Sequence, residues 1–174
     1  IDPLLISIVS ESLPHLKRGA IRDFFNILGE GTDNNPWYNK TENTYQRPGW
    51  KGRIEFFGAD DASKVRGPRR DILFMNEGNN IPWETARGLD IRTSRYTIVD
   101  WNPVSEFWAH ENWIGDPSNA YIHSTYMDAK KVLAQAVVDN IESYKDKDPN
   151  WWRIYGLGLV GKLEGLVHPL FEQV

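Results

Sequence analysis

This sequence contains two pairs of polar residues that could take part in chemistry, and each pair lies at the end of an apolar run. Asn76 and Glu77 end the segment RRDILFMNE, and Asp100 and Asn102 lie in the segment YTIVDWNP. A carboxylate can activate a water molecule for attack, and amide or carboxylate oxygens can orient a magnesium ion. These residue types therefore suit a metal-assisted hydrolysis in which Glu77 acts on the water.

The runs before these polar groups predict strands that would position them. Residues 72–76 are uncharged and mostly apolar, which is typical of a strand buried on both faces of a parallel sheet. Residues 96–100 form a similar run, and open α/β sheets bind ligands at the carboxyl ends of their strands. If the two strands are neighbours, Glu77, Asp100 and Asn102 converge on one edge of the sheet. The alternative is an ordinary core strand with a polar end.

The rest of the pattern alternates between strands and helices. Ser12 is a good N-cap, Pro48-Gly49 is a turn signal between two strands of a hairpin, and Thr125-x-x-Asp128 resembles a capping box. The predicted strands are residues 4–9, 44–47, 51–57, 72–76, 96–100, 120–125 and 151–159, and predicted helices begin near residues 12, 82, 105 and 125. This order predicts an α/β fold with a mostly parallel sheet flanked by helices.

Composition places the chain among ordinary globular proteins and excludes several classes. Its 174 residues are 40% hydrophobic and 25% charged, which is enough for one domain with a real core. The absence of cysteine excludes a disulfide or a thiolate metal site, and no apolar run approaches the length of a membrane helix. The net charge of −4 argues against a surface coated in basic residues, although it allows a local basic patch.

Other motifs carry weaker signals. Residues 156–162, GLGLVGK, match glycine-rich nucleotide-binding patterns, but Leu163 stands where a phosphate loop needs Ser or Thr, so we interpret them as a turn. The four histidines, including His15, lack metal-ligand spacing and are interpreted as core or surface residues. Arg66, before Gly67, is placed to reach a phosphate across a tight turn; the alternative is a surface salt bridge.

The order of these segments resembles the large subunit of tailed-phage terminases, the DNA-packaging motors. The matching segments are LLISIVSESLPHLKRGAIRDFFNIL, GRIEFFGADDASKVRG, RRDILFMNEGNNI, YTIVDWNP, YIHSTYMDAKKVL and WWRIYGLGLVGKLEG, which together span nearly the whole chain. In such proteins a phosphate-loop ATPase domain precedes an RNase H-like nuclease domain. The resemblance therefore implies that residues 1–174 are a single, truncated ATPase domain with a P-loop NTPase-like (Rossmann-like) fold. Residues 145–174 would be a linker, a last strand and a tail that leads toward an absent nuclease domain.

The resemblance also implies roles for individual residues. Asn76 and Glu77 occupy the Walker B positions, where Glu77 would polarise the attacking water and both residues would lie at the Mg²⁺ ion. Asn102 would sit near the coupling motif that senses the γ-phosphate, and Arg66 lies in a loop before the Walker B strand as a further nucleotide contact. The implied cofactors are ATP and Mg²⁺ in the full-length protein.

The resemblance implies partners and a location as well. The partners would be double-stranded DNA, the terminase small subunit, the portal protein and further copies of the chain in a ring. The location would be the cytoplasm of the bacterial host, transiently on the procapsid, with no membrane contact.

The family's Walker A loop lies upstream of the strand that LLISIV resembles, and this sequence begins at that strand. We therefore expect a fold that lacks the first strand and the phosphate loop. We also expect weak or no ATP binding and hydrolysis by these residues alone, and self-association through an exposed sheet edge.

Two other functions remain open from the residues. One is a metal-dependent nuclease, which needs about three carboxylates and has Glu77 and Asp100. The other is a non-catalytic interaction module whose partner surface is an apolar patch of exposed tryptophans, Trp37, Trp50, Trp108 and Trp113.

Overall fold

The computed structural model describes residues 4–162 of the chain. The chain divides into two compact units, Ile1–Trp101 and Asn102–Val174. The single domain that the sequence predicts over residues 1–174 stays a prediction. Within residues 4–162, no helix has the length and the apolar character needed to cross a membrane.

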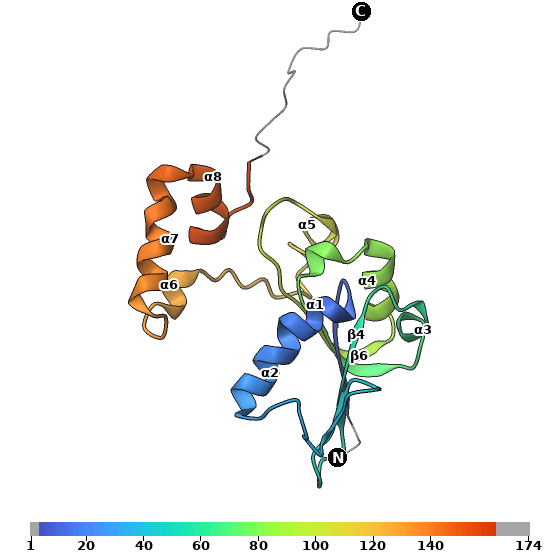
Figure 1. Ribbon diagram of the computed structural model, residues 1–174. Coiled ribbons are helices and arrows are strands. Elements are labelled where there is room, and N and C mark those ends of the chain that lie inside the picture. Colours follow the sequence, from blue (N-terminus) through green and yellow to red (C-terminus); the bar gives the residue numbers. More distant parts are fainter. Residues whose placement is uncertain (1–3, 163–174) are drawn as a thin grey trace, which may run out of the picture. The chain divides into compact units, whose positions relative to one another are not determined.

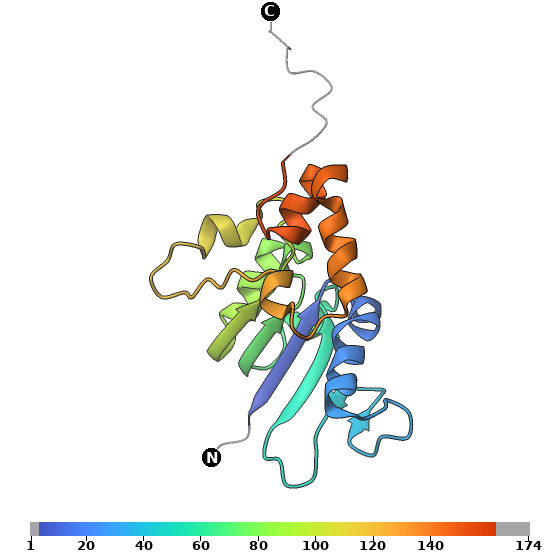
Figure 2. The same cartoon turned by 90° about the vertical axis from the view of Figure 1, so that its left-hand side faces the viewer.

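A six-stranded sheet forms the centre of the first unit. Its strands are β1 (Leu5–Ser10), β2 (Tyr38–Asn39), β3 (Thr44–Tyr45), β4 (Arg53–Gly58), β5 (Arg70–Met75) and β6 (Thr93–Val99). The order across the sheet is β2-β3-β4-β1-β5-β6, and Figures 1 and 2 show these strands side by side. β4, β1, β5 and β6 run parallel, whereas β2 and β3 pair antiparallel at one edge. The predicted α/β fold with a mostly parallel sheet is confirmed.

Helices lie on both faces of this sheet. Figure 1 shows α1 (Leu13–Arg18) and α2 (Ala20–Leu28) on one face, and α3 (Ala62–Val65) and α4 (Trp83–Asp90) on the other. Both faces of the central strands therefore have apolar neighbours, which explains why β1 and β5 are nearly continuous apolar runs. A core cluster joins α1, α2 and the strands β2, β3 and β4: Leu16, Ile21, Phe25, Tyr38, Tyr45, Ile54 and Phe56.

The predicted strands of the first unit all form, with one difference in burial. The hairpin around Pro48-Gly49 is confirmed by the antiparallel pairing of β3 with β4, and the short strand β2 was not predicted. The predicted strand at residues 96–100 is β6, a parallel neighbour of β5. It was expected to be buried, yet Tyr96 is 68% and Ile98 53% exposed. Tyr96 and Ile98 lie on the face of β6 opposite to Thr97, whose hydroxyl donates to Asp90 of α4, so that helix does not cover them.

The four parallel strands end at one edge of the sheet. There β1 leads into α1, β4 into α3, and β5 into the 3₁₀ helix η1 (Gly78–Asn80) and then α4. Packing is tight at this edge, because a Cβ atom on Gly58 would lie only 2.7 Å from the backbone nitrogen of Leu13. The edge is thus formed by short, closely packed connections.

The described part of the second unit is helical. It contains α5 (Trp108–Asn112), α6 (Tyr126–Ala129), α7 (Gln135–Lys147), α8 (Pro149–Trp151) and the π-helix η2 (Trp152–Gly156). The predicted capping box of Thr125 and Asp128 is confirmed at the start of α6: Asp128 accepts a hydrogen bond from the Thr125 N–H at 2.8 Å, and the Thr125 hydroxyl oxygen accepts one from Met127 N–H at 3.2 Å.

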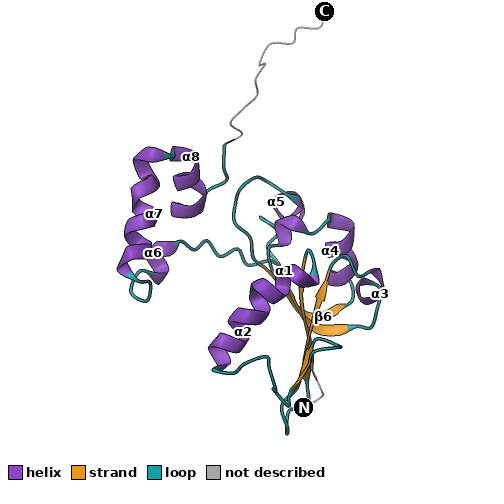
Figure 3. Ribbon diagram, viewed as in Figure 1, coloured by secondary structure: helices purple, strands orange, loops and turns teal. Residues whose placement is uncertain are grey.

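Two strand predictions in this unit are wrong. Residues 120–125 form a loop, as Figure 3 shows between α5 and α6, and Ile122 is 83% exposed. The predicted last strand at residues 151–159 is also wrong, because residues 149–156 are helical. The Asp148 side chain caps that helix by accepting a hydrogen bond from Trp151 N–H at 2.8 Å, and Pro149 suits its first position. The predicted tail beyond residue 162 lies outside the described residues.

Candidate active site

The predicted site residues at the ends of β5 and β6 do come together. The Asp100 carboxylate accepts hydrogen bonds from Asn76 Nδ2 at 3.2 and 3.3 Å and from the backbone N–H of Glu77 at 2.6 Å. The Asn76 N–H also donates to Val9 O at 2.8 Å, which fixes the end of β5 against β1. The predicted convergence of Glu77 and Asp100 on one edge is therefore confirmed.

The backbone of Glu77 adopts a conformation that few residues other than glycine take. Its φ and ψ angles are 53° and 55°, in the left-handed region, and it is the N-cap of η1. This conformation costs about 1 kcal/mol or more for a residue with a Cβ atom. Asp100 holds it on two sides, because its carboxylate accepts the Glu77 N–H and its backbone carbonyl accepts the Gly78 N–H at 2.9 Å. Such local strain is typical of functional positions.

Two further residues contact the Glu77 carboxylate. His15 Nε2 lies 3.5 Å from Glu77 Oε2, and Asn80 Nδ2 donates to the same oxygen at 3.3 Å. The side chains of His15 and Glu77 are 35% and 38% exposed, so this contact lies at the surface of the sheet edge. Sequence reasoning missed His15, since it treated the histidines as dispersed. One signal could have found it: His15 lies at the start of α1, the helix that follows β1. Since β1 and β5 are parallel, the start of α1 lies at the same edge of the sheet as Glu77.

The other two predicted site residues are Arg66 and Asn102. Arg66 is the exposed C-cap of α3, and among residues 4–162 no hydrogen bond or ion pair joins it to Asn76, Glu77 or Asp100. Asn102 is the first residue of the second unit, where its carbonyl accepts the Val104 N–H at 2.8 Å. The predicted roles of Arg66 and Asn102 in nucleotide binding stay predictions.

The two alternative functions gain no support from the described residues. Within residues 4–162, no three His, Asp or Glu side chains are grouped to hold a metal ion, as the nuclease alternative requires. Of the four tryptophans in the predicted partner surface, Trp50 is 43% exposed but Trp108 is buried. Trp37 and Trp50 belong to the first unit, and Trp108 and Trp113 to the second.

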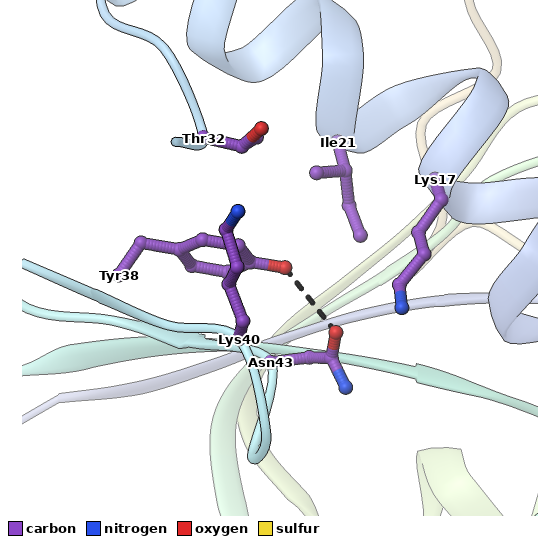
Figure 4. Close-up of a pocket in the computed structure, with 6 residues that line it drawn as sticks. All are labelled: Lys17, Ile21, Thr32, Tyr38, Lys40 and Asn43. Atoms are coloured by element: carbon purple, nitrogen blue, oxygen red, sulfur yellow. Dashed lines mark hydrogen bonds between the residues drawn. The ribbon is translucent and has the colours of Figure 1, made fainter. Parts of the chain in front are cut away.

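A separate hollow lies beside the hairpin. It has a volume of about 240 Å³, and Figure 4 shows the side chains that line it: Lys17, Ile21, Thr32, Tyr38, Lys40 and Asn43. The Tyr38 hydroxyl donates to Asn43 Oδ1 at 3.2 Å, and burial raises the pKa of that hydroxyl, so it remains a neutral donor. None of the predicted site residues lines this hollow.

The oxygen atoms at the sheet edge are suited to a hydrolytic reaction. His15 and Asn80 both reach Glu77 Oε2, and among the described residues no hydrogen-bond donor reaches Oε1. One oxygen of the carboxylate is thus available to a water molecule. The amide nitrogen of Asn76 is engaged by Asp100, which leaves its Oδ1 oxygen as a hard ligand of the kind that Mg²⁺ prefers. Asn76 and Glu77 therefore offer oxygen atoms of the type that magnesium ions bind.

The parallel sheet and its flanking helices form an α/β fold that solved structures share. Solved structures with the same fold are large terminases of phages. The large terminase of a thermophilic bacteriophage matches with a TM-score of 0.77 and 19% identity, over 99% of this chain and 45% of that chain. A structure of the same terminase in complex with ATP-γ-S matches with a TM-score of 0.67 and 16% identity, over 91% of this chain and 40% of that chain.

A third match is the ATPase domain of the large terminase of Thermus phage P74-26, with a TM-score of 0.61 and 13% identity, over 91% of this chain and 78% of that one. The chain therefore spans less than half the length of the first two terminase chains that it matches. No protein-family model and no curated protein matches the chain. The resemblance to terminase large subunits is confirmed at the level of the fold.

Proposed function

We propose that this chain is part of the ATPase motor of a phage DNA-packaging terminase large subunit and supplies the Walker B and coupling side of the ATP site. The observation that carries the proposal is the meeting of Asn76, Glu77 and Asp100 at the carboxyl edge of two adjacent parallel strands. Ligands of open α/β sheets bind at this edge. The shared fold with a terminase that has been solved with ATP-γ-S and with ADP supports a nucleotide as the ligand.

In this proposal each residue of the edge has a distinct task. Glu77 polarises the water that attacks the γ-phosphate of ATP, through the carboxylate oxygen that no donor among the described residues reaches. Asp100 holds the Glu77 backbone, and with it the start of the side chain. The Asn76 oxygen and Glu77 would hold Mg²⁺, which neutralises phosphate charge when bound. Asn102 contributes to sensing the γ-phosphate, and Arg66 is a further nucleotide contact.

The wider setting follows from the same proposal. The motor would act on double-stranded DNA with the terminase small subunit and the portal protein, as a ring of copies in the host cytoplasm. The 174 residues alone would bind and hydrolyse ATP weakly or not at all, because the phosphate-cradling groups of such a site come from a Walker A loop. ATP hydrolysis is therefore a property that we assign to the full-length protein.

The substitution Glu77→Gln tests the proposal. It keeps the size of the side chain and removes the carboxylate that acts on water, so we expect at least about a 100-fold loss of ATP hydrolysis in the full-length protein. Phosphate release is the measurement. Glu84→Gln is the matched control, since Glu84 lies on α4 in an exposed ion pair with Arg87 and should leave the rate unchanged. Hydrolysis that persists in Glu77→Gln at the wild-type rate would refute the proposed role.

A further inference from the structure

Ser10, His15 and Glu77 form a chain of contacts at the sheet edge. Ser10 Oγ lies 3.0 Å from His15 Nδ1, and His15 Nε2 lies 3.5 Å from Glu77 Oε2. Ser10 is fully buried at the end of β1, whereas His15 and Glu77 are partly exposed. The chain of contacts thus runs from the core to the proposed catalytic carboxylate.

The fold itself places these three residues together. β1 and β5 are parallel neighbours with Val9 opposite Met75, so the residues that follow both strands leave the sheet at the same edge. The connection from β1 to α1 is only two residues long, because α1 begins at Leu13, and His15 therefore lies in its first turn. The position of His15 is set by backbone packing and does not depend on a long flexible loop.

The chemistry of the three groups fixes which ring nitrogen faces Glu77 with a proton. A carboxylate only accepts hydrogen bonds, so His15 Nε2 must carry a proton in order to bind it. Nδ1 then either accepts the Ser10 hydroxyl proton in the neutral ring or donates to Ser10 Oγ in the charged ring. In both forms Ser10 lies at Nδ1, and Nε2 is the ring nitrogen that lies 3.5 Å from Glu77 Oε2. The orientation is the same whatever the charge of the ring.

We infer that Ser10 and His15 are a positioning pair that holds one oxygen of the Glu77 carboxylate, so that the other oxygen meets the attacking water. This inference rests on the proposed function of Glu77. The distance of 3.5 Å is longer than an ordinary hydrogen bond, and contacts of this kind tighten when the substrate is bound. Asn80 supports the same oxygen from the other side of the turn, at 3.3 Å.

Two substitutions of His15 separate positioning from packing. The amide nitrogen of Gln reaches the place of Nε2, whereas that of Asn reaches only the place of Nδ1. His15→Gln therefore keeps a donor for Glu77, and His15→Asn keeps only the contact with Ser10. In the full-length protein we expect kcat for ATP hydrolysis within about threefold of wild type for His15→Gln and about 10-fold lower for His15→Asn, with KM unchanged in both.

A second measurement does not depend on activity. The carboxyl ¹³C resonance of Glu77 in the 174-residue chain should move in His15→Asn and stay near its wild-type position in His15→Gln. Lys17→Ala, two residues further along α1, is the control and should change neither kcat nor the resonance. If the His15 variants unfold at a lower temperature than the wild type, Ser10→Ala is the variant that tests the inference. It removes only the hydroxyl group, so we expect kcat to fall by about threefold.

The outcomes distinguish this inference from the proposed function. Equal kcat values for His15→Gln and His15→Asn, with Glu77→Gln inactive, overturn the positioning pair alone. An active Glu77→Gln variant overturns the proposed function and the inference with it. A low kcat in His15→Asn and a rescued kcat in His15→Gln, together with the displaced Glu77 resonance, support both.

Discussion

The substitution Asp100→Ala removes the group that holds the left-handed turn at Glu77. It deletes the acceptor of the Asn76 side chain and of the Glu77 N–H, the latter at 2.6 Å. A buried hydrogen bond to a charged group contributes about 1.5–3 kcal/mol, and because Asp100 is exposed we take about 1 kcal/mol for each of the two. The free energy needed to open the turn should therefore fall by about 2 kcal/mol, which makes the opening equilibrium constant roughly 30-fold larger.

Amide hydrogen exchange of Glu77 measures this opening directly, since its N–H is bonded to the carboxylate that the substitution removes. We expect exchange about 30-fold faster in Asp100→Ala. Asp71→Ala is the matched control: Asp71 accepts the Leu5 N–H at 2.9 Å at the other end of β5, so exchange should rise at Leu5 and not at Glu77. A Glu77 amide that exchanges within about threefold of the wild-type rate in Asp100→Ala would show that Asp100 does not hold the turn.

Two further expectations concern the frame of the sheet. Gly58→Ala should lower the free energy of unfolding by about 2 kcal/mol, because its Cβ would lie 2.7 Å from a backbone nitrogen. Gly88→Ala, a helical glycine with nothing within 4 Å, should raise it by about 0.5–1 kcal/mol; urea unfolding checks both, and equal effects would contradict the packing at the edge. The Leu5 N–H and neighbouring groups lower the pKa of Asp71 from its ordinary 3.8, so this carboxylate stabilises the fold above that pH and the contribution is lost as the pH falls through the lower, folded-state pKa. The Leu5 amide resonance should titrate with a midpoint below 3.8 in wild type and show no such transition in Asp71→Asn.

The sheet could be predicted from the sequence because its apolar runs are short and alternate with predicted helices, as in a parallel α/β sheet. The runs at residues 4–9, 72–76 and 96–100 correspond to β1, β5 and β6, and their parallel pairing brings Glu77 to Asp100. A short apolar run cannot by itself distinguish a buried strand from a helix. That ambiguity explains the error at residues 151–159, where Asp148 and Pro149 are the helix-start signals that the strand prediction passed over.

Only the part of the candidate site that lies at strand ends could be predicted from the sequence. Residues that follow neighbouring parallel strands lie at the same edge of the sheet, and this rule was enough to identify Asn76, Glu77 and Asp100. His15 was missed because its contact depends on how the first turn of α1 packs after β1, and one sequence contains no periodic signal for that. The left-handed backbone of Glu77 was equally hidden, since Asn76-Glu77-Gly78 does not show which residue makes the turn.

At position 77, the residue that would give the most stable fold differs from the residue that supplies a carboxylate, because the backbone of Glu77 is left-handed. Glycine would adopt φ of 53° without strain, so its absence here means that the chain gives up about 1 kcal/mol of stability to keep a carboxylate at the turn. A library of variants ranked by the amount of folded protein would favour glycine or asparagine at position 77. Under the proposed function, the same library ranked by ATP hydrolysis in the full-length protein would return glutamate. Under the proposed function, residue 77 is thus a position where the side chain that the reaction needs is not the one that the backbone conformation favours.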